Sequence, residues 1–304
     1  MNNITHKISS LRIAVAKAIV NVSDANTILA IQNKTVPKGD VFEFSRAAGL
    51  LAIKKTSDMI PDCHPLPIEF ASFQFNTHEL QIEIMVEVHA IYRTGVEVEA
   101  MHGAAIAALT IYDMLKPIDA HVEIGSIKLD HKKGGKKDFK KGSNDPLSCA
   151  VIVCSDSVSK GHHEDSAGKA VIRKLSVSGL ETAHYSIIPD EKTAIQQLVQ
   201  QLVAQKFDLV FFTGGTGLSP RDITPESIEP LLDRTIPGIM EAARAYGQER
   251  TPYAMLSRGV AGFIKDSLIL TLPGSTRGAE ETMDAIFPYL LHIFHVKKGM
   301  RHSS

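Results

Sequence analysis

Two glycine-rich segments follow apolar runs in the second half of the chain, and both have the composition of anion-binding loops. Thr213–Asp222 reads TGGTGLSPRD and comes directly after LVFF. Its glycines let backbone amides approach a phosphate closely, and Thr213 and Thr216 add hydroxyl donors. Leu272–Thr276 (LPGST) has the same chemistry, and Ser275 is placed to cap a helix whose N-terminus attracts anions. Neither segment has the Gly-Lys-Ser/Thr ending of a P-loop, so the sequence predicts a phosphate or carboxylate site, with tight turns as the alternative.

Carboxylates accompany these loops. Asp190 follows the run Ile-Ile-Pro, and Asp222 closes the first glycine-rich segment. Two carboxylates beside a phosphate site predict Mg²⁺, which prefers a few carboxylates together with phosphate oxygens. Spacing alone favours Asp190 as a helix N-cap and Asp222 as a turn residue before Thr224-Pro225, where Thr would be the N-cap and Pro the first helical residue.

The first half of the chain has charged residues whose spacing allows either a structural or a catalytic role. Asp113 and Lys116 are spaced i, i+3 on one helical face. Such a pair is an exposed ion pair of little energetic value, or an acid–base pair if the lysine is buried near anions. Lys38 precedes Asp40, a suitable N-cap for the next helix, and a surface lysine is the alternative.

Three further features surround these pairs. Glu97 and Glu99 point the same way if their segment is extended. His64 lies between prolines, which hold it rigidly; a structural histidine is the alternative, and a nucleophilic pair with the adjacent Cys63 is disfavoured. The segment 131–146, HKKGGKKDFKKGSNDP, has the composition of a linker or of a lysine-rich loop that closes over a polyphosphate.

The elements that position these residues differ between the halves. The first half predicts an α+β fold with an antiparallel sheet and helices on one face. Its strands are expected at 12–22, 68–75, 80–92 and 122–129, with a hairpin turn at 76–79, and its helices at 39–59 and 100–115. The second half predicts a doubly wound, mostly parallel α/β sheet with a ligand at the carboxyl ends of its strands. Its strands are expected at 150–153, 183–188, 209–212 and 267–272, and its helices at 166–178, 191–205 and from 276 to about 295.

Composition agrees with two domains, 1–141 and 148–304, in a chain of 304 residues. Lys+Arg is 33 and Asp+Glu is 34, a net charge of −1, which excludes a protein that coats polyanions as a whole. Three cysteines without a C-x-x-C pair argue against a disulfide framework or a four-cysteine zinc site, so reduced thiols and a cytoplasmic protein are expected. The most apolar stretch, 100–112, is shorter than the ~20 residues of a membrane span.

Residues 148–298 resemble the molybdopterin-binding family that includes molybdopterin adenylyltransferase. The resemblance rests on CSDS (154–157), DSAG (165–168), IPDE (188–191), TGGTGLSPRD (213–222), TPE (224–226), IPGIMEAAR (236–244), LSRGVAG (256–262) and LPGST (272–276). It implies a three-layer α/β fold in which ATP and molybdopterin yield adenylylated molybdopterin and pyrophosphate, with Mg²⁺ and no tightly bound organic cofactor. A pterin-binding module without transferase activity is the alternative.

This resemblance assigns roles by position. It places Mg²⁺-assisted chemistry on Asp190 and Asp222. The phosphates and the rest of the substrate are expected at Ser155, Gly214, Gly215, Thr216, Gly217, Pro273, Gly274 and Ser275.

Residues 1–139 resemble cyclic pyranopterin monophosphate synthase. The motifs are KGDVF (38–42), SRAAG (45–49), IPDCHPL (60–66), TGVEVEA (94–100), LTIYDMLK (109–116) and KKGGK (132–136), with Asp62 where the family has an apolar residue. The resemblance implies a ferredoxin-like α+β fold, hexamers of paired subunits, and conversion of 3′,8-cyclised dihydro-GTP to cyclic pyranopterin monophosphate and pyrophosphate.

The resemblance makes Asp113 and Lys116 the central acid–base pair. It places Lys38, Lys132 and Lys136 around the triphosphate or the rearranging ring. Substrate contacts are expected at Arg12, Cys63, His64, Glu97, Val98 and Glu99.

Together these features predict a bifunctional enzyme of molybdenum cofactor biosynthesis. We expect a homo-oligomer (trimer or hexamer) with molybdopterin synthase or a molybdenum-insertion protein as a partner. Two alternatives remain: a nucleic-acid-binding protein that uses the lysines at 132–141, where Phe139 is the only interleaved aromatic residue, and a scaffold with inactive sites.

Overall fold

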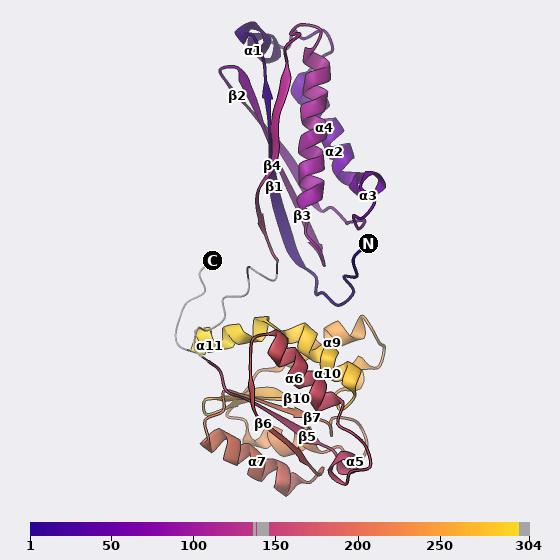
Figure 1. Cartoon of the computed structure of the whole chain (residues 1–304), viewed down its shortest axis with the longest axis vertical. Coiled ribbons are helices and arrows are strands. Elements are labelled where there is room, and N and C mark those ends of the chain that lie inside the picture. Colours follow the sequence, from indigo (N-terminus) through magenta and orange to yellow (C-terminus); the bar gives the residue numbers. More distant parts are fainter. Residues whose placement is uncertain (136–137, 139–145, 298–304) are drawn as a thin grey trace. The chain divides into compact units, whose positions relative to one another are not determined.

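The computed structural model divides the chain into two compact units, Met1–Asp138 and Phe139–Ser304 (Figure 1). It describes residues 1–135, 138 and 146–297. Lys136, one of the predicted site residues, lies outside the described residues. No described helix is long and apolar enough to cross a membrane.

The N-terminal unit has the βαββαβ order of a ferredoxin-like fold. Its elements are β1 (Ser10–Asn21), α1 (Ala25–Gln32), α2 (Val41–Lys54), α3 (Thr56–Met59), β2 (Phe70–His78), β3 (Gln81–Tyr92), α4 (Glu97–Leu115) and β4 (Glu123–Lys133). The sheet order is β2-β3-β1-β4 and all neighbours are antiparallel. Helices α2 and α4 lie on one face of the sheet (Figure 1), which confirms the predicted α+β class.

Small residues let α4 lie directly on β1. The side chains that β1 turns toward the helices include Ala14, Ala16 and Ala18, and all three are fully buried. The facing side of α4 is equally small, with Ala100, Ala104, Ala107 and Ala108 buried. This close packing fixes α4, and therefore the charged residues at both of its ends, against the sheet.

The structure corrects several local predictions. The β2–β3 hairpin turns at Glu79-Leu80 rather than at 76–79, with Glu79 in the left-handed region at φ 47°. Helix α1 was not predicted; Asp24 caps it by accepting from the Asn26 amide. Glu97 and Glu99 belong to the first turn of α4, so the extended segment that would point them the same way is not formed. Residues two apart on a helix point to different sides.

The C-terminal unit is an α/β fold of three layers. Its elements are β5 (Cys149–Cys154), α5 (Asp156–Ser159), α6 (Ala167–Val177), β6 (Thr182–Ile188), α7 (Lys192–Ala204), β7 (Leu209–Thr213), α8 (Thr224–Ile228), η1 (Glu229–Leu231), β8 (Arg234–Thr235), α9 (Pro237–Gln248), η2 (Ala254–Leu256), β9 (Ala261–Ile264), β10 (Ser267–Leu272), α10 (Thr276–Ile286), η3 (Tyr289–Leu291) and α11 (His292–Lys297). Figure 1 shows α6, α9 and α10 on one side of the sheet and α7 on the other.

The sheet order of this unit is β6-β5-β7-β10-β9-β8. The pairs from β6 to β10 are parallel, while β9 and β8 add an antiparallel edge that the sequence did not predict. The doubly wound, mostly parallel prediction is confirmed. The carboxyl ends of β5, β6, β7 and β10 therefore meet at one edge of the sheet, where ligands bind in folds of this type.

Candidate functional site

A cavity of about 210 Å³ lies at the carboxyl ends of the parallel strands of the C-terminal unit. It brings together six of the predicted site residues: Ser155, Asp190, Gly214, Gly215, Asp222 and Gly274. Thr216 and Gly217 do not line it. Val153, Cys154, Val158, Glu164, Asp165, Ser166, Ala167 and Thr213 complete the lining. We call this cavity the strand-end cleft.

Asp190 has the most unusual environment in the strand-end cleft. It is only 9% exposed, and its Oδ1 has no hydrogen-bond partner. Burial is the main cause that raises the pKa of Asp190 to about 6, and the charge of Asp156 adds to it. Glu191, not Asp190, is the N-cap residue of α7, so the N-cap interpretation is wrong. A buried, unpaired carboxylate oxygen at a cleft is expected where a ligand supplies the partner.

The glycine-rich loop after β7 shapes the space in front of Asp190. Gly215 has φ 62°, and a Cβ there would lie 2.5 Å from Asp190 Oδ1 and 2.2 Å from Thr224 Oγ1. Thr224 Oγ1 also lacks a partner. Gly214 has φ 103° and lies against the Cys154 carbonyl. A side chain at either position would clash with these neighbouring atoms and fill part of the cleft. Glycine is therefore needed at both positions, for the close packing and for the positive φ.

Other residues of this loop are used to hold it. Asp222 Oδ2 accepts from the Ser219 amide at 2.8 Å, which is the turn role. The Thr213 hydroxyl donates to the Pro273 carbonyl at 2.8 Å, so it ties the two glycine-rich loops together rather than facing a ligand. Helix α8 begins at Thr224 with Ile223 as its N-cap residue, one position earlier than predicted.

An ion pair beside Asp190, between Asp156 and Arg221, was not predicted from the sequence. Arg221 donates from Nε to Asp156 Oδ2 at 2.9 Å, and its Nη2 contacts the same oxygen. Asp156 Oδ1 in turn accepts from the Asp190 amide at 3.2 Å. Asp156 lies in CSDS and Arg221 in the glycine-rich motif, but no spacing pattern links two residues from separate loops.

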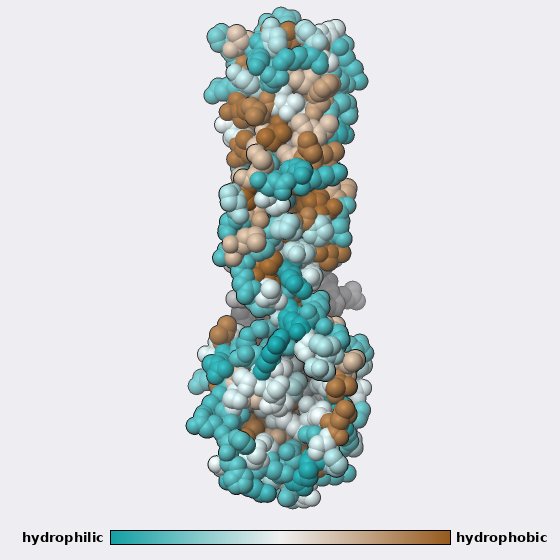
Figure 2. Space-filling view, turned by 90° about the vertical axis from the view of Figure 1, so that its right-hand side faces the viewer, coloured by the Kyte–Doolittle hydropathy of each residue, from teal (hydrophilic) through white to brown (hydrophobic). Residues whose placement is uncertain are grey.

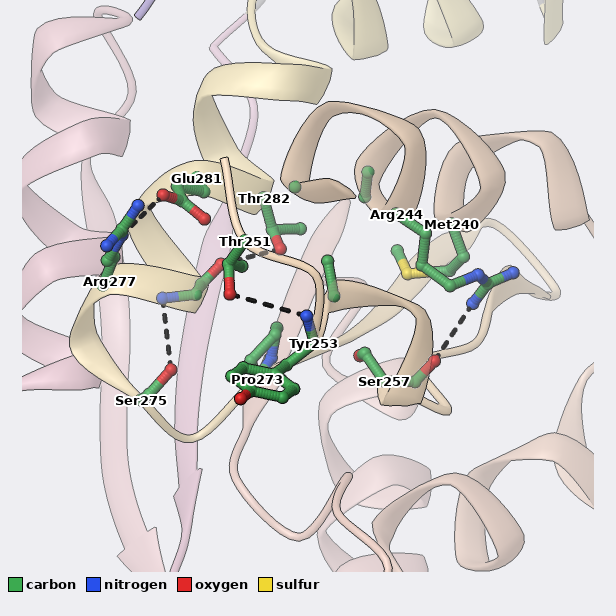
Figure 3. A pocket seen from close by; sticks show the side chains of 14 residues that line it. Met240, Arg244, Thr251, Tyr253, Ser257, Pro273, Ser275, Arg277, Glu281 and Thr282 are labelled. Atoms are coloured by element: carbon green, nitrogen blue, oxygen red, sulfur yellow. Dashed lines mark hydrogen bonds and ion pairs between the residues drawn. The ribbon is translucent and has the colours of Figure 1, made fainter. Parts of the chain in front are cut away.

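A second cavity, of about 290 Å³, lies beside the glycine-rich segment 272–276 (Figure 3). We call it the α9–α10 pocket, after the helices that form its walls. Its lining residues are Met240, Ala243, Arg244, Gly247, Thr251, Tyr253, Ala254, Ser257, Pro273, Ser275, Arg277, Gly278, Glu281 and Thr282. Pro273 and Ser275 face this pocket, while Gly274 between them lines the strand-end cleft. The segment 272–276 is therefore a wall shared by two cavities, and Ser275 caps α10 as predicted, at 3.2 Å from the Gly278 amide.

In the N-terminal unit, Lys38, Asp113 and Lys116 form a lysine–aspartate cluster at the C-terminal end of α4. Lys38 Nζ lies 2.7 Å from Asp113 Oδ2, and Lys116 Nζ lies 2.8 Å from Asp113 Oδ1. Hydrogen bonds from Lys116 and then Lys38 lower the pKa of Asp113 to about 2, and the pKa of Lys116 is raised by the same contact. All three side chains are partly exposed, so within one copy Asp113 and Lys116 form the exposed ion pair rather than the buried acid–base pair, and the cluster is open to a substrate.

The remaining predicted residues of this unit gather where β1 begins and β3 and β4 end. We call them the arginine–glutamate cluster: Arg12, Cys63, His64, Glu97, Glu99 and Lys132. Lys132 Nζ contacts Glu97 Oε1 at 2.5 Å. Arg12 is 9% exposed and donates from Nε to the Tyr92 carbonyl. His64 Nε2 lies 2.9 Å from the Asn2 carbonyl, and Val98 is exposed on the helix surface.

Two members of the arginine–glutamate cluster, Glu99 and Cys63, have raised pKa values. Glu99 is almost fully buried, and burial raises its pKa. Burial also raises the pKa of the Cys63 thiol, with the charges of Glu99 and Asp62 adding to the effect. A thiol with a raised pKa is a poor nucleophile, in agreement with the interpretation that Cys63 and His64 are not a nucleophilic pair.

The two clusters lie at opposite ends of α4. Glu97 and Asp113 are 16 residues apart on one helix, which corresponds to about 24 Å at 1.5 Å per residue. Within one copy of the chain, the predicted synthase residues therefore form two groups rather than one site.

The two folds define a two-domain protein in which an α+β unit with a lysine–aspartate cluster precedes an α/β unit with a cleft at its strand ends. Residues 1–135 match the model of the MoaC family, and residues 150–292 match that of the probable molybdopterin binding domain. A molybdenum cofactor biosynthesis bifunctional protein of Chlorobaculum tepidum is 36% identical over 91% of this chain and 88% of its own length. One from Synechococcus elongatus is 35% identical over 88% of each chain.

The chain belongs to the family of molybdenum cofactor biosynthesis bifunctional proteins. Its first unit is also 46% identical to a cyclic pyranopterin monophosphate synthase of Trichlorobacter lovleyi, over 45% of this chain and 86% of that protein.

Proposed function

We propose that the N-terminal unit converts 3′,8-cyclised dihydro-GTP to cyclic pyranopterin monophosphate and pyrophosphate, and that the C-terminal unit adenylylates molybdopterin with ATP. The contact that supports the first activity is the lysine–aspartate cluster. Asp113 holds two ammonium groups within hydrogen-bond distance, and these contacts lower its pKa to about 2, so Asp113 stays ionised. Such a cluster can stabilise charge on the rearranging ring and, once a substrate covers it, exchange protons with that ring.

The separation of about 24 Å along α4 between Glu97 and Asp113 favours a site assembled from two copies. Cationic Lys132 and buried Arg12 would then serve the triphosphate, while Lys38, Asp113 and Lys116 of a second copy serve the rearrangement. Helices α2 and α4 carry exposed apolar side chains, including Phe44, Leu51, Leu109 and Tyr112, and Figure 2 shows such patches on the surface of this unit. Apolar patches of this kind favour association of copies.

Complementation between inactive variants tests this arrangement. Asp113→Ala and Lys132→Ala each remove one cluster, and each variant alone should be inactive. When the two chains are co-expressed in equal amounts, half of the pairs are mixed, and each mixed pair has one intact site of two. We therefore expect about 25% of wild-type synthase activity if copies pair at random.

A matched control uses two changes in the same cluster. Co-expression of Asp113→Ala with Lys116→Ala leaves no pairing with an intact lysine–aspartate cluster, so activity should stay at the level of the single variants. Recovery in this control, or no recovery in the first mixture, would contradict a site shared between copies.

For the second activity, the supporting observation is the unpaired Asp190 carboxylate that faces Gly215. The phosphates of ATP would take the space that Gly214 and Gly215 keep open, and Asp190 and Asp222 would hold the Mg²⁺ that accompanies them. No group of three or more metal-ligating side chains occurs among the described residues, which suits Mg²⁺ held by two carboxylates and substrate phosphates. Bound Mg²⁺ supplies charge neutralisation at the phosphates.

The α9–α10 pocket would hold the pterin. Its shared wall with the strand-end cleft, segment 272–276, brings the terminal phosphate of a pterin in one cavity next to nucleotide phosphates in the other. Arg244, Arg277 and several hydroxyl groups give this pocket polar contacts around the apolar Met240, Ala243 and Pro273.

Incubation of the full chain with molybdopterin, ATP and Mg²⁺ tests the second activity. Release of pyrophosphate and formation of adenylylated molybdopterin are expected, and Asp190→Asn should abolish both. Molybdopterin binding without pyrophosphate release would instead identify a pterin-binding module that is not a transferase.

A further inference from the structure

The α9–α10 pocket contains a carboxylate that the proposed reaction does not use. Among the fourteen described residues that line the pocket, Glu281 is the only acid. Its side chain is 16% exposed, although it belongs to a surface helix. Holding a charged carboxylate largely out of water is unfavourable unless it is paired, so the pocket side of Glu281 requires an explanation.

Arg277 supplies one partner. Its Nε contacts Glu281 Oε1 at 2.7 Å, one helical turn away, and its own side chain is 70% exposed. In Figure 3 one carboxylate oxygen is joined to Arg277, and the other is turned toward Thr282 on the pocket side. Arg277 thus pairs with one carboxylate oxygen from outside and fixes the orientation of the side chain, which leaves the second oxygen to accept from a ligand.

The chemistry of that edge selects its ligand. A carboxylate only accepts hydrogen bonds, and it accepts two from a planar group with adjacent N–H donors. A pterin ring has such a group, formed by N3–H and the 2-amino substituent. The walls contribute apolar contact from Met240 and Pro273, and the exposed Tyr253 ring stands at the rim, where it can cover a flat ring.

We propose that Glu281 selects the 2-amino-4-oxo ring of the pterin by accepting from N3–H and the 2-amino group, and that Arg277 positions Glu281 for this contact. The proposal rests on the proposed function, because it assumes that the pterin enters the α9–α10 pocket. On this proposal Glu281 also discriminates against rings that have an oxygen at position 2. In such a ring the 2-oxo group and the Glu281 carboxylate, both hydrogen-bond acceptors, would face each other.

Binding of two ring analogues to the full chain tests the proposal. The probes are 6-hydroxymethylpterin and 6-hydroxymethyllumazine, which differ in having an amino group or an oxygen at position 2. At pH 7 the wild type should bind the pterin at least about tenfold more tightly than the lumazine, the discrimination expected from a hydrogen bond to a charged acceptor. Glu281→Gln should remove most of this ratio, because its amide offers a donor to the 2-oxo group.

Glu280→Gln is the matched control. Glu280 neighbours Glu281 on α10, but it pairs with Arg173 at 3.2 Å and does not line the pocket, so its loss should leave the ratio unchanged. Both probes are measured on the same sample, so the ratio does not depend on the fraction of folded protein. A second variant, Arg277→Ala, should lower the ratio less than Glu281→Gln does.

The outcomes separate this proposal from the proposed function. A wild type without preference for the pterin, or a Glu281→Gln variant that keeps the preference, overturns the role of Glu281. The adenylylation assay on the same wild-type preparation decides the function independently. Pyrophosphate release together with an unchanged ratio in Glu281→Gln would overturn the selector and leave the transferase standing.

Discussion

Replacement of Asp190 by Asn should stabilise the C-terminal unit while it abolishes adenylylation. Asp190 is buried, its Oδ1 has no partner, and Asp156 and Asp222 repel its charge. Its pKa is about 6 in the folded chain against an ordinary value of 3.8. At about 1.4 kcal/mol per pH unit between these two values, the ionised carboxylate costs at most about 3 kcal/mol of stability. Asn removes that cost.

The sign of the pH dependence follows from the same shift. The folded protein binds the Asp190 proton more tightly than the unfolded chain does, so the free energy of unfolding falls as the pH rises from about 4 to about 6. The gain from Asp190→Asn should therefore be largest at pH 8, about half as large at pH 5, and absent below the unfolded pKa.

Hydrogen exchange of the amides in β5 and β7, measured in EDTA, reports this unit separately from the rest of the chain. Glu191→Gln is the matched control, because it removes an adjacent but exposed carboxylate and should change stability by less than about 0.5 kcal/mol. A destabilised Asp190→Asn variant, or a gain that is the same at pH 5 and pH 8, would refute the argument that burial and repulsion strain this carboxylate.

Two further results are expected. Gly214→Ala should destabilise the C-terminal unit by more than about 2 kcal/mol in thermal unfolding, because its Cβ would lie 2.1 Å from a backbone oxygen, whereas Gly179→Ala, with a similar φ but open space, should cost no more than about 1–2 kcal/mol. Asp113→Ala and Lys116→Ala should each abolish the cyclic product in an assay with cyclised dihydro-GTP, and full activity in both would contradict their assignment as the acid–base pair.

The sequence predicted the fold classes well, because each rests on a periodic pattern. Alternating residues in β3 and the apolar stripe of α7 specify their elements locally, and the order of elements then restricts the topology. The weakest predictions were at element ends, such as the β2–β3 turn and the start of α4. There the choice depends on contacts between segments, such as Lys132 with Glu97, that spacing does not reveal.

The sequence motifs predicted less about the sites than the periodic patterns predicted about the folds. Motifs placed Asp190 and Gly215 correctly at one edge of the sheet, since parallel strands share that edge. They did not reveal the Asp156–Arg221 pair or the α9–α10 pocket, both of which form between segments distant in sequence. Nor did they reveal that the synthase residues divide into two clusters.

The two units differ in whether one copy of the chain brings all the residues of the proposed site together. In the C-terminal unit, a single copy supplies both cavities and the segment 272–276 between them. In the N-terminal unit, the rigid helix α4 holds Glu97 and Asp113 about 24 Å apart, and no side-chain motion spans that distance. A cyclised nucleotide that contacts both clusters must therefore lie between copies of the chain. On the proposed function, the first activity therefore requires assembly of copies of the chain.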